Sequence, residues 1–300
     1  MPPTFLKTVN SHTDNTVKYV FRTEAGSIIE VAYINKNDGK DIICLPSQTM
    51  CEMACKFCHT TEYIGKIKTI NLTSVEIVYV TKFIVDAQKL TDNNRTLLIS
   101  FMGCGEPILN STTIVFSMNT LKEELEEIGI PYVRFSLATS LPESASTLFF
   151  AFCSAIKKSK LQVKLHLSLH YTDNELRKEW MSKSMSIEPS IAAVQFYKTF
   201  TGNDVEIHYA LVNGVNDKKQ NAWDLALLLS DKDMPVKFLF YNKKDTSEYT
   251  ASDKNRLTSF YELFDTCGIS YEYYIPPGLD IGASCGQFFM DYYVEEQLIK

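Results

Sequence analysis

Residues 51–60, "CEMACKFCHT", place three cysteines, Cys51, Cys55 and Cys58, within eight positions of the chain. An aromatic residue, Phe57, precedes the third cysteine, and His59 follows it. Thiolates are soft ligands that suit iron–sulfur clusters or zinc, and a tight loop can point all three toward one centre. The spacing therefore predicts a metal centre in this loop.

The triad has three possible interpretations. A structural zinc site needs four ligands, and the only local fourth, His59, adjoins Cys58 and would be strained in the same tetrahedron. A [4Fe–4S] cluster held by three cysteines leaves one iron open to a reactant. The third interpretation is three small hydrophobic residues, although a polar loop offers little burial. The residues favour a cluster and leave zinc as the alternative.

The composition predicts one main globular domain in a reducing compartment. The chain has 300 residues, 45% of them hydrophobic and 22% charged, and its start resembles neither a secretory signal nor a membrane span. We therefore expect a cytoplasmic protein in which the eight cysteines act as ligands, catalytic thiols or buried residues rather than disulfides. A net charge of −6 argues against binding nucleic acid by electrostatics alone.

Around the cysteines, the hydrophobic pattern predicts an α/β fold. Two β-branched runs, "VKYVFRT" (17–23) and "SIIEVAYI" (27–34), predict an N-terminal hairpin joined by residues 24–26. Six short apolar runs then alternate with helical segments, which indicates βαβ units and a parallel sheet, open or curled. These predicted strands start with "IICL" (42–45), "TLLISF" (96–101) and "YVRFSLA" (132–138) and continue with "VKLHLSL" (163–169), "VEIHYAL" (205–211) and "VKFLFY" (236–241).

Polar clusters follow these predicted strands, and in such folds the carboxyl ends of the strands form the ligand face. The cysteine loop follows the first strand. The later clusters are "GCGEP" (103–107), Thr139-Ser140, "SLH" (168–170), "NGVND" (213–217) and "YNKKD" (241–245). We expect all of them on one rim of the sheet.

The cysteine spacing, with the aromatic residue before the third cysteine, resembles the signature of the radical S-adenosylmethionine (SAM) superfamily. Five ordered blocks between about Ile28 and Gln287 are similar to those of the RlmN/Cfr-type RNA adenosine methyltransferases. They are "ICLPSQTMCEMACKFCHT", "FMGCGEPILN", "LSLHYTDNELRKEWM", "VEIHYALVNGVND" and "GASCGQ". The resemblance implies a partial (β/α)6 barrel (41–300) with a short N-terminal β-hairpin extension (1–40).

The resemblance also implies the cofactors and the residues that hold them. Cys51, Cys55 and Cys58 would bind one [4Fe–4S] cluster, and the open iron would bind SAM, whose reductive cleavage gives a 5′-deoxyadenosyl radical. Ala138 stands where the family has a SAM-contacting serine, and Thr139 or Ser140 is the candidate replacement. The expected SAM contacts are Gly105, Glu106, Ser168, Leu169, His170 and Asn242.

Two further cysteines carry the distinctive chemistry of the resembled family. Cys285 would receive a methyl group, which is then attached to an adenine carbon, and Cys44 would release the product by forming a disulfide. Glu30 aligns with a glutamate that accepts the proton leaving the ring. We expect both thiols in exposed polar loops, because reactive thiols need access. Cys104, Cys153 and Cys267 have no motif role and are expected to be core or incidental residues.

These features predict a radical SAM methyltransferase that methylates C2 or C8 of an adenine in rRNA or tRNA, as a monomer with a flavodoxin or ferredoxin as reductant. Only 43 residues precede Cys44, so the N-terminal helical domain of known family members is expected to be absent. One alternative is the same chemistry on a nucleotide or other small molecule. A second alternative is a zinc- or cluster-bearing binding module without catalysis.

Overall fold

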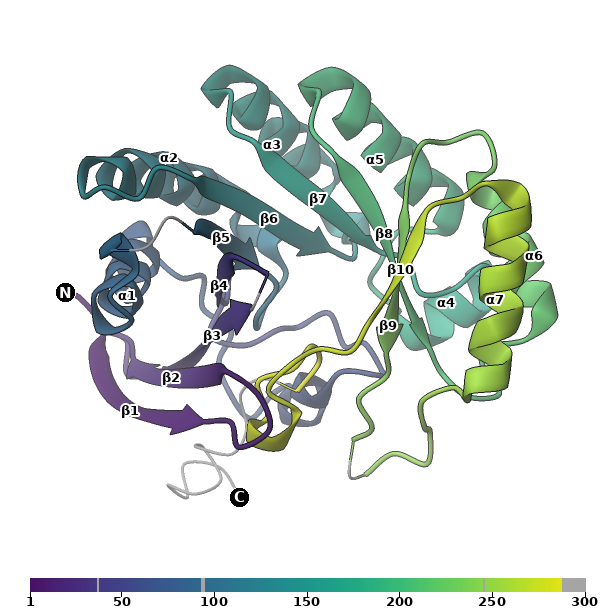
Figure 1. Ribbon diagram of the computed structural model, residues 1–300, viewed down its shortest axis with the longest axis horizontal. Helices are drawn as coiled ribbons and strands as arrows, with labels where there is room; N and C mark the ends of the chain where they lie inside the picture. The colour runs from purple at the N-terminus through teal and green to yellow at the C-terminus, as the bar shows by residue number, and fades with distance from the viewer. Residues whose placement is uncertain (37, 93–94, 245, 288–300) are drawn as a thin grey trace.

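The computed structural model describes residues 1–36, 38–92, 95–244 and 246–287 (Figure 1). Ten strands form one sheet in which each strand lies beside its neighbours in sequence, from β1 to β10. The sheet curves, and the helices cover its outer side (Figure 1). The predicted barrel range, 41–300, extends past the described residues, because 288–300 lie outside them.

The N-terminal part is a three-stranded antiparallel ribbon that continues into the parallel sheet. The predicted hairpin is confirmed as β2 (Thr16–Arg22) and β3 (Ile28–Lys36), which pair antiparallel around a turn with Gly26 at φ 83°. The sequence did not predict β1 (Thr4–Asn10), a largely exposed edge strand with mixed polar residues. Because β3 also pairs antiparallel with β4, the ribbon and the barrel share one sheet.

The next six strands, β4 to β9, are parallel to one another, as the alternating pattern predicted. A further short strand, β10 (Tyr271–Tyr274), pairs parallel with β9 and was not predicted. The sheet order places β1 and β10 at opposite edges, so the barrel is open in the described part of the chain. The bounds of the six strands are Lys40–Cys44 (β4), Thr96–Phe101 (β5), Val133–Thr139 (β6), Val163–Ser168 (β7), Val205–Leu211 (β8) and Val236–Phe240 (β9).

Helices follow the strands as predicted, and their ends match the capping residues in the sequence. Thr73 accepts a hydrogen bond from the Glu76 N–H while Glu76 accepts one from the Thr73 N–H, a capping box that starts α1. No helix in the described segments is long and apolar enough to cross a membrane. The α-helices are Ser74–Ala87 (α1), Ser111–Glu127 (α2), Ser146–Ser159 (α3), Asn174–Trp180 (α4), Ile187–Thr201 (α5), Lys219–Leu229 (α6) and Lys254–Cys267 (α7).

The two faces of each strand have different partners. On β7, Val163, Leu165 and Leu167 belong to the large hydrophobic core that includes residues of the covering helices. The alternate residues Lys164 and His166 point the other way, because successive side chains of a strand leave opposite faces. The inner surface at β7 therefore carries polar residues, and the carboxyl ends of β5 to β9 open into a cavity.

Candidate active site

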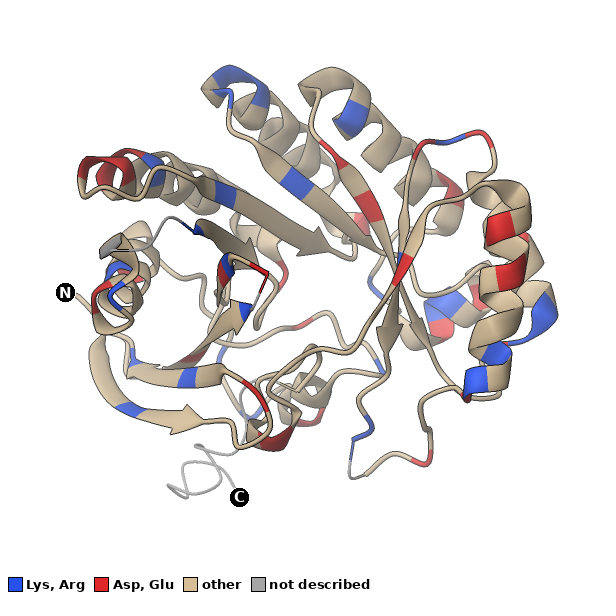
Figure 2. Cartoon of the chain, viewed as in Figure 1, with Lys and Arg blue, Asp and Glu red and all other residues tan. Residues whose placement is uncertain are grey.

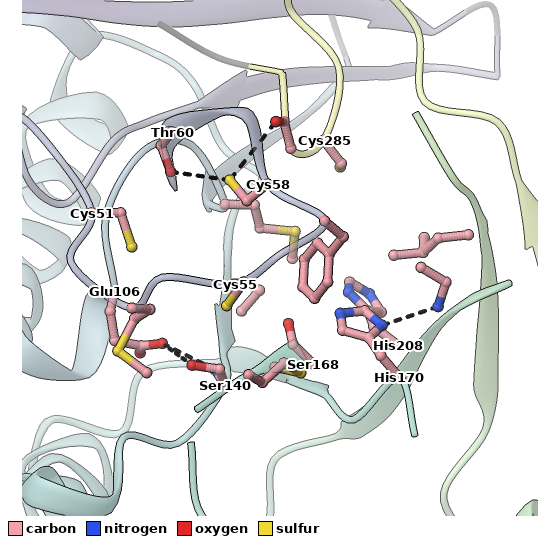
Figure 3. Close-up of a pocket in the computed structure, with 18 of the residues that line it drawn as sticks. Cys51, Cys55, Cys58, Thr60, Glu106, Ser140, Ser168, His170, His208 and Cys285 are labelled. Carbon is pink, nitrogen blue, oxygen red and sulfur yellow. Dashed lines mark hydrogen bonds between the residues drawn. The ribbon is translucent and has the colours of Figure 1, made fainter. Parts of the chain in front are cut away.

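A cavity at the carboxyl ends of the strands brings together residues from the whole length of the barrel (Figure 3). The sulfur atoms of Cys51, Cys55 and Cys58 point toward a common space, and Cys285 lies across from Cys58 (Figure 3). The lining residues also include Gly105, Glu106, Ser140, Ser168, His170, His208 and Asn242. Five of the six predicted clusters therefore meet at this cavity, whereas none of the residues 213–217 lines it.

The cysteine loop is fixed by hydrogen bonds to elements far away in the sequence. The Lys56 N–H donates to the Trp180 carbonyl at the end of α4 (2.9 Å), and the His59 N–H donates to the Gly286 carbonyl (2.8 Å). Within the loop, the Thr61 hydroxyl donates to the Cys55 carbonyl (2.6 Å). The loop thus joins α4 on one side to the C-terminal segment on the other.

The three thiols would lose their protons more readily if a metal were bound. Burial raises the pKa of Cys51 to about 12, and the neighbouring Cys58 contributes to this rise. Burial also raises the pKa of Cys55, with contributions from Cys51 and Cys58, while Arg177 opposes the shift. Thiols that resist ionisation, as Cys51 and Cys55 do, are stabilised as thiolates when they share a positively charged centre.

Glu106 is a buried carboxylate held in one orientation at the cavity wall. One oxygen accepts hydrogen bonds from the Thr139 hydroxyl (2.6 Å) and the Ile108 N–H (3.2 Å). The other accepts from the N–H and the hydroxyl of Ser140, at 3.0 and 2.9 Å. Burial raises the Glu106 pKa and these bonds oppose the rise, so a bound cation would favour the charged form. Thr139 and Ser140 therefore position Glu106.

The glycines of "GCGEP" lie where another segment of the polypeptide, residues 45–48, packs directly against them. A Cβ atom at Gly105 would come within 2.4 Å of the Ser47 hydroxyl oxygen, and one at Gly103 within 2.9 Å of the Leu45 carbonyl. Gly105 also has φ 105°, a conformation that favours glycine. Close packing of the polypeptide against itself thus accounts for both glycines, and both also line the cavity.

The end of β7 contributes Ser168 and His170. The His170 Nδ1 atom accepts a hydrogen bond from the Ala210 N–H (3.0 Å), which leaves the Nε2 atom as the donor of a neutral imidazole. His170 has φ 58°, and the Asn216 side chain donates to its carbonyl at 2.7 Å. Leu169, in contrast, has its side chain in the hydrophobic core and not among the cavity-lining residues.

Cys44 is the last residue of β4 and is 8% exposed, so the expectation that it lies in an exposed loop is wrong. Its position follows from pairing on both sides, opposite Ala32 of β3 and Ser100 of β5. Burial raises the pKa of Cys44, and the charge of Cys285 adds to this effect. The two thiols are thus close enough to influence each other.

Cys285 is partly exposed in the loop after β10, and the Asn242 side chain donates a hydrogen bond to its carbonyl (2.7 Å). Glu30, in contrast, is 2% exposed on β3 and is not one of the residues that line the cavity. The Lys18 ammonium lies 3.4 Å from its carboxylate. Glu30 also adds to the rise in the pKa of Cys104, which places it near that buried thiol.

Comparison with known proteins identifies the family. No protein-family model matches the sequence. The probable dual-specificity RNA methyltransferase RlmN of Clostridium acetobutylicum is 31% identical over 298 residues, which is 98% of this chain and 81% of that protein. The same enzyme of Exiguobacterium sibiricum is 30% identical and covers 91% of this chain and 75% of that protein. The chain belongs to the RlmN family of radical SAM methyltransferases.

Solved structures agree with this assignment. A radical SAM methyltransferase from Sphaerobacter thermophilus superposes with a TM-score of 0.81 and 29% identity, over 96% of this chain and 81% of that chain. SuiB of Streptococcus suis bound to SAM superposes with a TM-score of 0.52 over 84% of this chain and 55% of that chain. At 13% identity, the SuiB match shows a shared fold only.

RlmN-family enzymes carry a [4Fe–4S] cluster and SAM, and the residues of this chain fit both. Three soft sulfur donors face one space, which suits a cluster with one open iron better than a four-ligand zinc site. Next to the thiols, the cavity is lined by the carboxylate of Glu106 and by Ser168 and Asn242. A fixed carboxylate is suited to the ammonium group of an amino acid.

Sequence reasoning missed a charged network beneath the cavity in this RlmN-family protein. Glu206 on β8 lies 2.6 Å from the Lys164 ammonium, 2.8 Å from the Lys237 ammonium and 2.9 Å from the His166 Nδ1 atom. His208 borders the same carboxylate and lines the cavity. The alternating polar positions of "VKLHLS" and "VEIHYAL" were the available signal.

The network resembles a metal site, because His166, Glu206 and His208 place three ligand atoms within 4.8 Å of one another. Two lysine ammonium groups already neutralise the shared carboxylate, however, and would repel a metal cation. Burial opposes the charge of Glu206, yet its histidine and lysine neighbours hold its pKa below the ordinary value. The negative charge of Glu206 is therefore compensated by side chains of the protein itself.

Proposed function

We propose that this protein methylates an adenine carbon, C2 or C8, in RNA, with Cys285 as the methyl carrier and Cys44 as the resolving thiol. The observation that carries the proposal is that Cys285 lines the same cavity as the three cysteines of the loop and acts electrostatically on Cys44. The names of its relatives as dual-specificity RNA methyltransferases support rRNA or tRNA as the substrate.

The same proposal assigns the residues that hold the cofactors. Cys51, Cys55 and Cys58 bind the cluster, because their sulfur atoms share one space. The cavity-lining residues Gly105, Glu106, Ser168, His170 and Asn242 contact SAM. Leu169 contributes to this site through its backbone, since its side chain lies in the core and its carbonyl accepts a hydrogen bond from Arg177.

When bound, the cluster and SAM supply one-electron chemistry and the methyl group. Cys285 carries the methyl group as a thioether, and its thiol proton leaves to solvent. With one hydrogen atom taken from the methyl group and one further electron accepted by the bound cofactors, a methylene link would join the Cys285 sulfur to the adenine carbon, and Glu30 would accept the proton from that carbon. Cys44 would then attack the Cys285 sulfur as a thiolate, so that the sulfur–methylene bond breaks and a disulfide forms. The released carbon would take up a proton, which completes the methyl group of the base.

Because Cys44 is buried, its attack on the Cys285 sulfur requires that the thiol first lose its proton. A buried thiol with a raised pKa is a poor nucleophile, so the proton of Cys44 must leave when the substrate link is present. Glu30, on the neighbouring strand β3, can accept this proton once it has released the proton taken from the adenine carbon. The disulfide must afterwards be reduced by two electrons from outside the chain.

The partners follow from this chemistry. We propose a flavodoxin or ferredoxin as the electron donor, and a protein that acts as a monomer in the cytoplasm, where a thiol pair can be returned to its reduced form. A neutral or acidic surface does not by itself attract RNA, so substrate binding depends on local contacts at the cavity rim.

Two measurements test the proposal. Nucleosides from cells with and without this gene should differ in 2-methyladenosine or 8-methyladenosine by mass spectrometry. In the Cys44→Ala variant, a covalent RNA–protein link through Cys285 should accumulate, whereas Cys153→Ala, a change in the outer core, should leave turnover intact. Normal product formation by Cys44→Ala, with unmodified protein, would show that the thiol assignment is wrong.

A further inference from the structure

Arg177 of α4 is a buried cation without a carboxylate partner in the described part of the chain. It is 1% exposed. Its guanidinium donates to the carbonyls of Met185 (2.8 Å), Ser168 (3.0 Å) and Ser140 (3.1 Å), and also to that of Leu169. Every one of these acceptors is an uncharged backbone oxygen.

Other buried or partly buried cations of the molecule are neutralised by acidic side chains. The Arg95 guanidinium lies 2.8 Å from the Asp41 carboxylate, and the Lys237 ammonium lies 2.8 Å from the Glu206 carboxylate. Taking a charge out of water is costly unless an opposite charge compensates for it. The uncompensated charge of Arg177 therefore points to a negative group that the polypeptide alone does not provide.

Two of the four carbonyls that bind Arg177 belong to the cavity wall. Ser140 follows β6, and Ser168 ends β7, so one side chain ties the ends of two neighbouring strands together. Both residues line the cavity, and Ser140 in turn holds the Glu106 carboxylate. Arg177 is thus placed to position the residues proposed to contact SAM.

The same side chain lies beneath the cysteine loop. An Nη1 atom of Arg177 is 3.4 Å from the Met181 sulfur, and Cys55 packs against the hydrophobic cluster that contains Met181 and Trp180. The Trp180 carbonyl accepts the N–H of Lys56, the residue after Cys55. Arg177 is also close enough to act electrostatically on the Cys55 thiol.

We infer that Arg177 is a positioning residue for the cavity wall and that its charge raises the reduction potential of the cluster bound at Cys51, Cys55 and Cys58. This inference rests on the cluster ligands assigned under the proposed function, but not on the substrate. Reduction adds an electron to a centre that already has three thiolate ligands. A nearby buried cation stabilises the reduced form more than the oxidised form, because the reduced form carries more negative charge.

The test is the midpoint potential of the cluster in the full chain, reconstituted anaerobically and followed by electron paramagnetic resonance during a redox titration. In Arg177→Met the midpoint potential should become more negative by at least about 59 mV. For a one-electron couple this is a tenfold change in the reduction equilibrium. Arg177→Lys keeps the charge and should recover most of the shift. Lys178→Met removes an exposed cation from the same helix and should change nothing.

An unchanged potential in an Arg177→Met protein that holds four irons would overturn the inference. If that variant does not fold, Met181→Glu and Met181→Gln provide the same test with Arg177 in place. The glutamate adds a negative charge beside the guanidinium and should lower the potential relative to the glutamine, and equal potentials would overturn the inference. If the reconstituted protein holds zinc in place of iron, the assignment of the cluster ligands is wrong. If the Arg177 variant shows the shift in midpoint potential but the protein does not methylate RNA, only the proposed substrate is wrong.

Discussion

The two halves of the barrel wall are built from different chemistry. On β3 and β4, the inner residues Ile28, Ala32 and Cys44 pack in a mostly apolar cluster that also contains Cys104, and Glu30 lies on the same face of β3 with its buried partner Lys18. On β7 to β10, the inner surface carries the ion pairs around Glu206, and Figure 2 shows acidic and basic positions along these strands. The cavity is lined by the carboxyl ends of β5 to β9, the cysteine loop and the segment around Cys285.

The difference shows how one sheet can keep some thiols protonated in one region and pair charges in another. In the apolar half, burial raises the pKa of Cys44 and Cys104, so these thiols stay neutral until the chemistry requires otherwise. In the charged half, the Lys237 ammonium bridges the carboxylates of Glu206 and Glu272, at 2.8 and 2.7 Å. Arg177, which has only carbonyl partners, follows neither pattern.

The largest expected effect comes from breaking the charged half. Glu206→Gln keeps the size of the side chain but leaves the ammonium groups of Lys164 and Lys237 without their shared counter-charge. Removal of one partner from a buried ion pair typically costs about 3–5 kcal/mol. Urea denaturation of the apo-protein should show a loss of stability of this size.

The matched control is Glu272→Gln, which removes the other carboxylate from the same Lys237 ammonium. The Glu272 side chain is 56% exposed, so this change should cost about 0.2–1 kcal/mol, the usual value of a solvent-exposed pair. Equal losses of unfolding free energy in the two variants would mean that the buried Glu206 network stabilises the fold no more than a solvent-exposed ion pair does. The contrast between the two halves would then disappear.

The sequence predicted the architecture wherever a strand is apolar on at least one full face. The six parallel strands were recognisable because helices cover their outer side, which therefore carries apolar residues such as Leu165 and Ile207. The two edge strands were not: β1 is mostly exposed with mixed polar residues, and β10 has four residues. Edge strands bury less and need no continuous apolar pattern.

The candidate site divides in the same way. The cysteine triad and Cys285 were predictable because their roles depend on residue type and local spacing. Arg177 and the Glu206 network were not, because their partners come from strands that are adjacent only after folding: Lys164 and Glu206 are 42 positions apart. The burial of Cys44 was missed for the same reason, since it results from pairing with Ala32 and Ser100.

A smaller expected effect is a difference in thiol reactivity, which tests the apolar half. Cys267 is exposed, whereas burial lowers both the access to Cys44 and its thiolate fraction. Alkylation of the apo-protein by iodoacetamide at pH 8, followed by peptide mass spectrometry, should label Cys267 about a hundredfold faster than Cys44, or more. Cys153, buried in the outer core, should be as slow as Cys44. Rapid labelling of Cys44 in the folded protein would contradict its placement in the wall.

The smallest expected effect is a pH dependence that arises in the charged half. Burial lowers the pKa of His166 from 6.5 to about 3, with Glu206 opposing this shift and His208 and Lys237 adding to it. Between these two values the unfolded chain binds a proton that the folded protein does not. Stability is therefore lost as the pH falls below about 6.5, by up to about 1.4 kcal/mol per pH unit for this one histidine.

The window from pH 6.5 to 5 isolates the buried histidines, because the carboxylates of the unfolded chain take up protons at lower pH. His166→Gln cannot bind the proton, so the slope of unfolding free energy against pH should decrease by up to about 1.4 kcal/mol per unit in urea titrations of the apo-protein. His12→Gln, which changes an exposed histidine, should leave the slope as it is. A slope unaffected by His166→Gln would mean that His166 is protonated in the folded protein. The charged half would then carry one more positive charge than the carboxylates of Glu206 and Glu272 balance, in contrast to the neutral network described above.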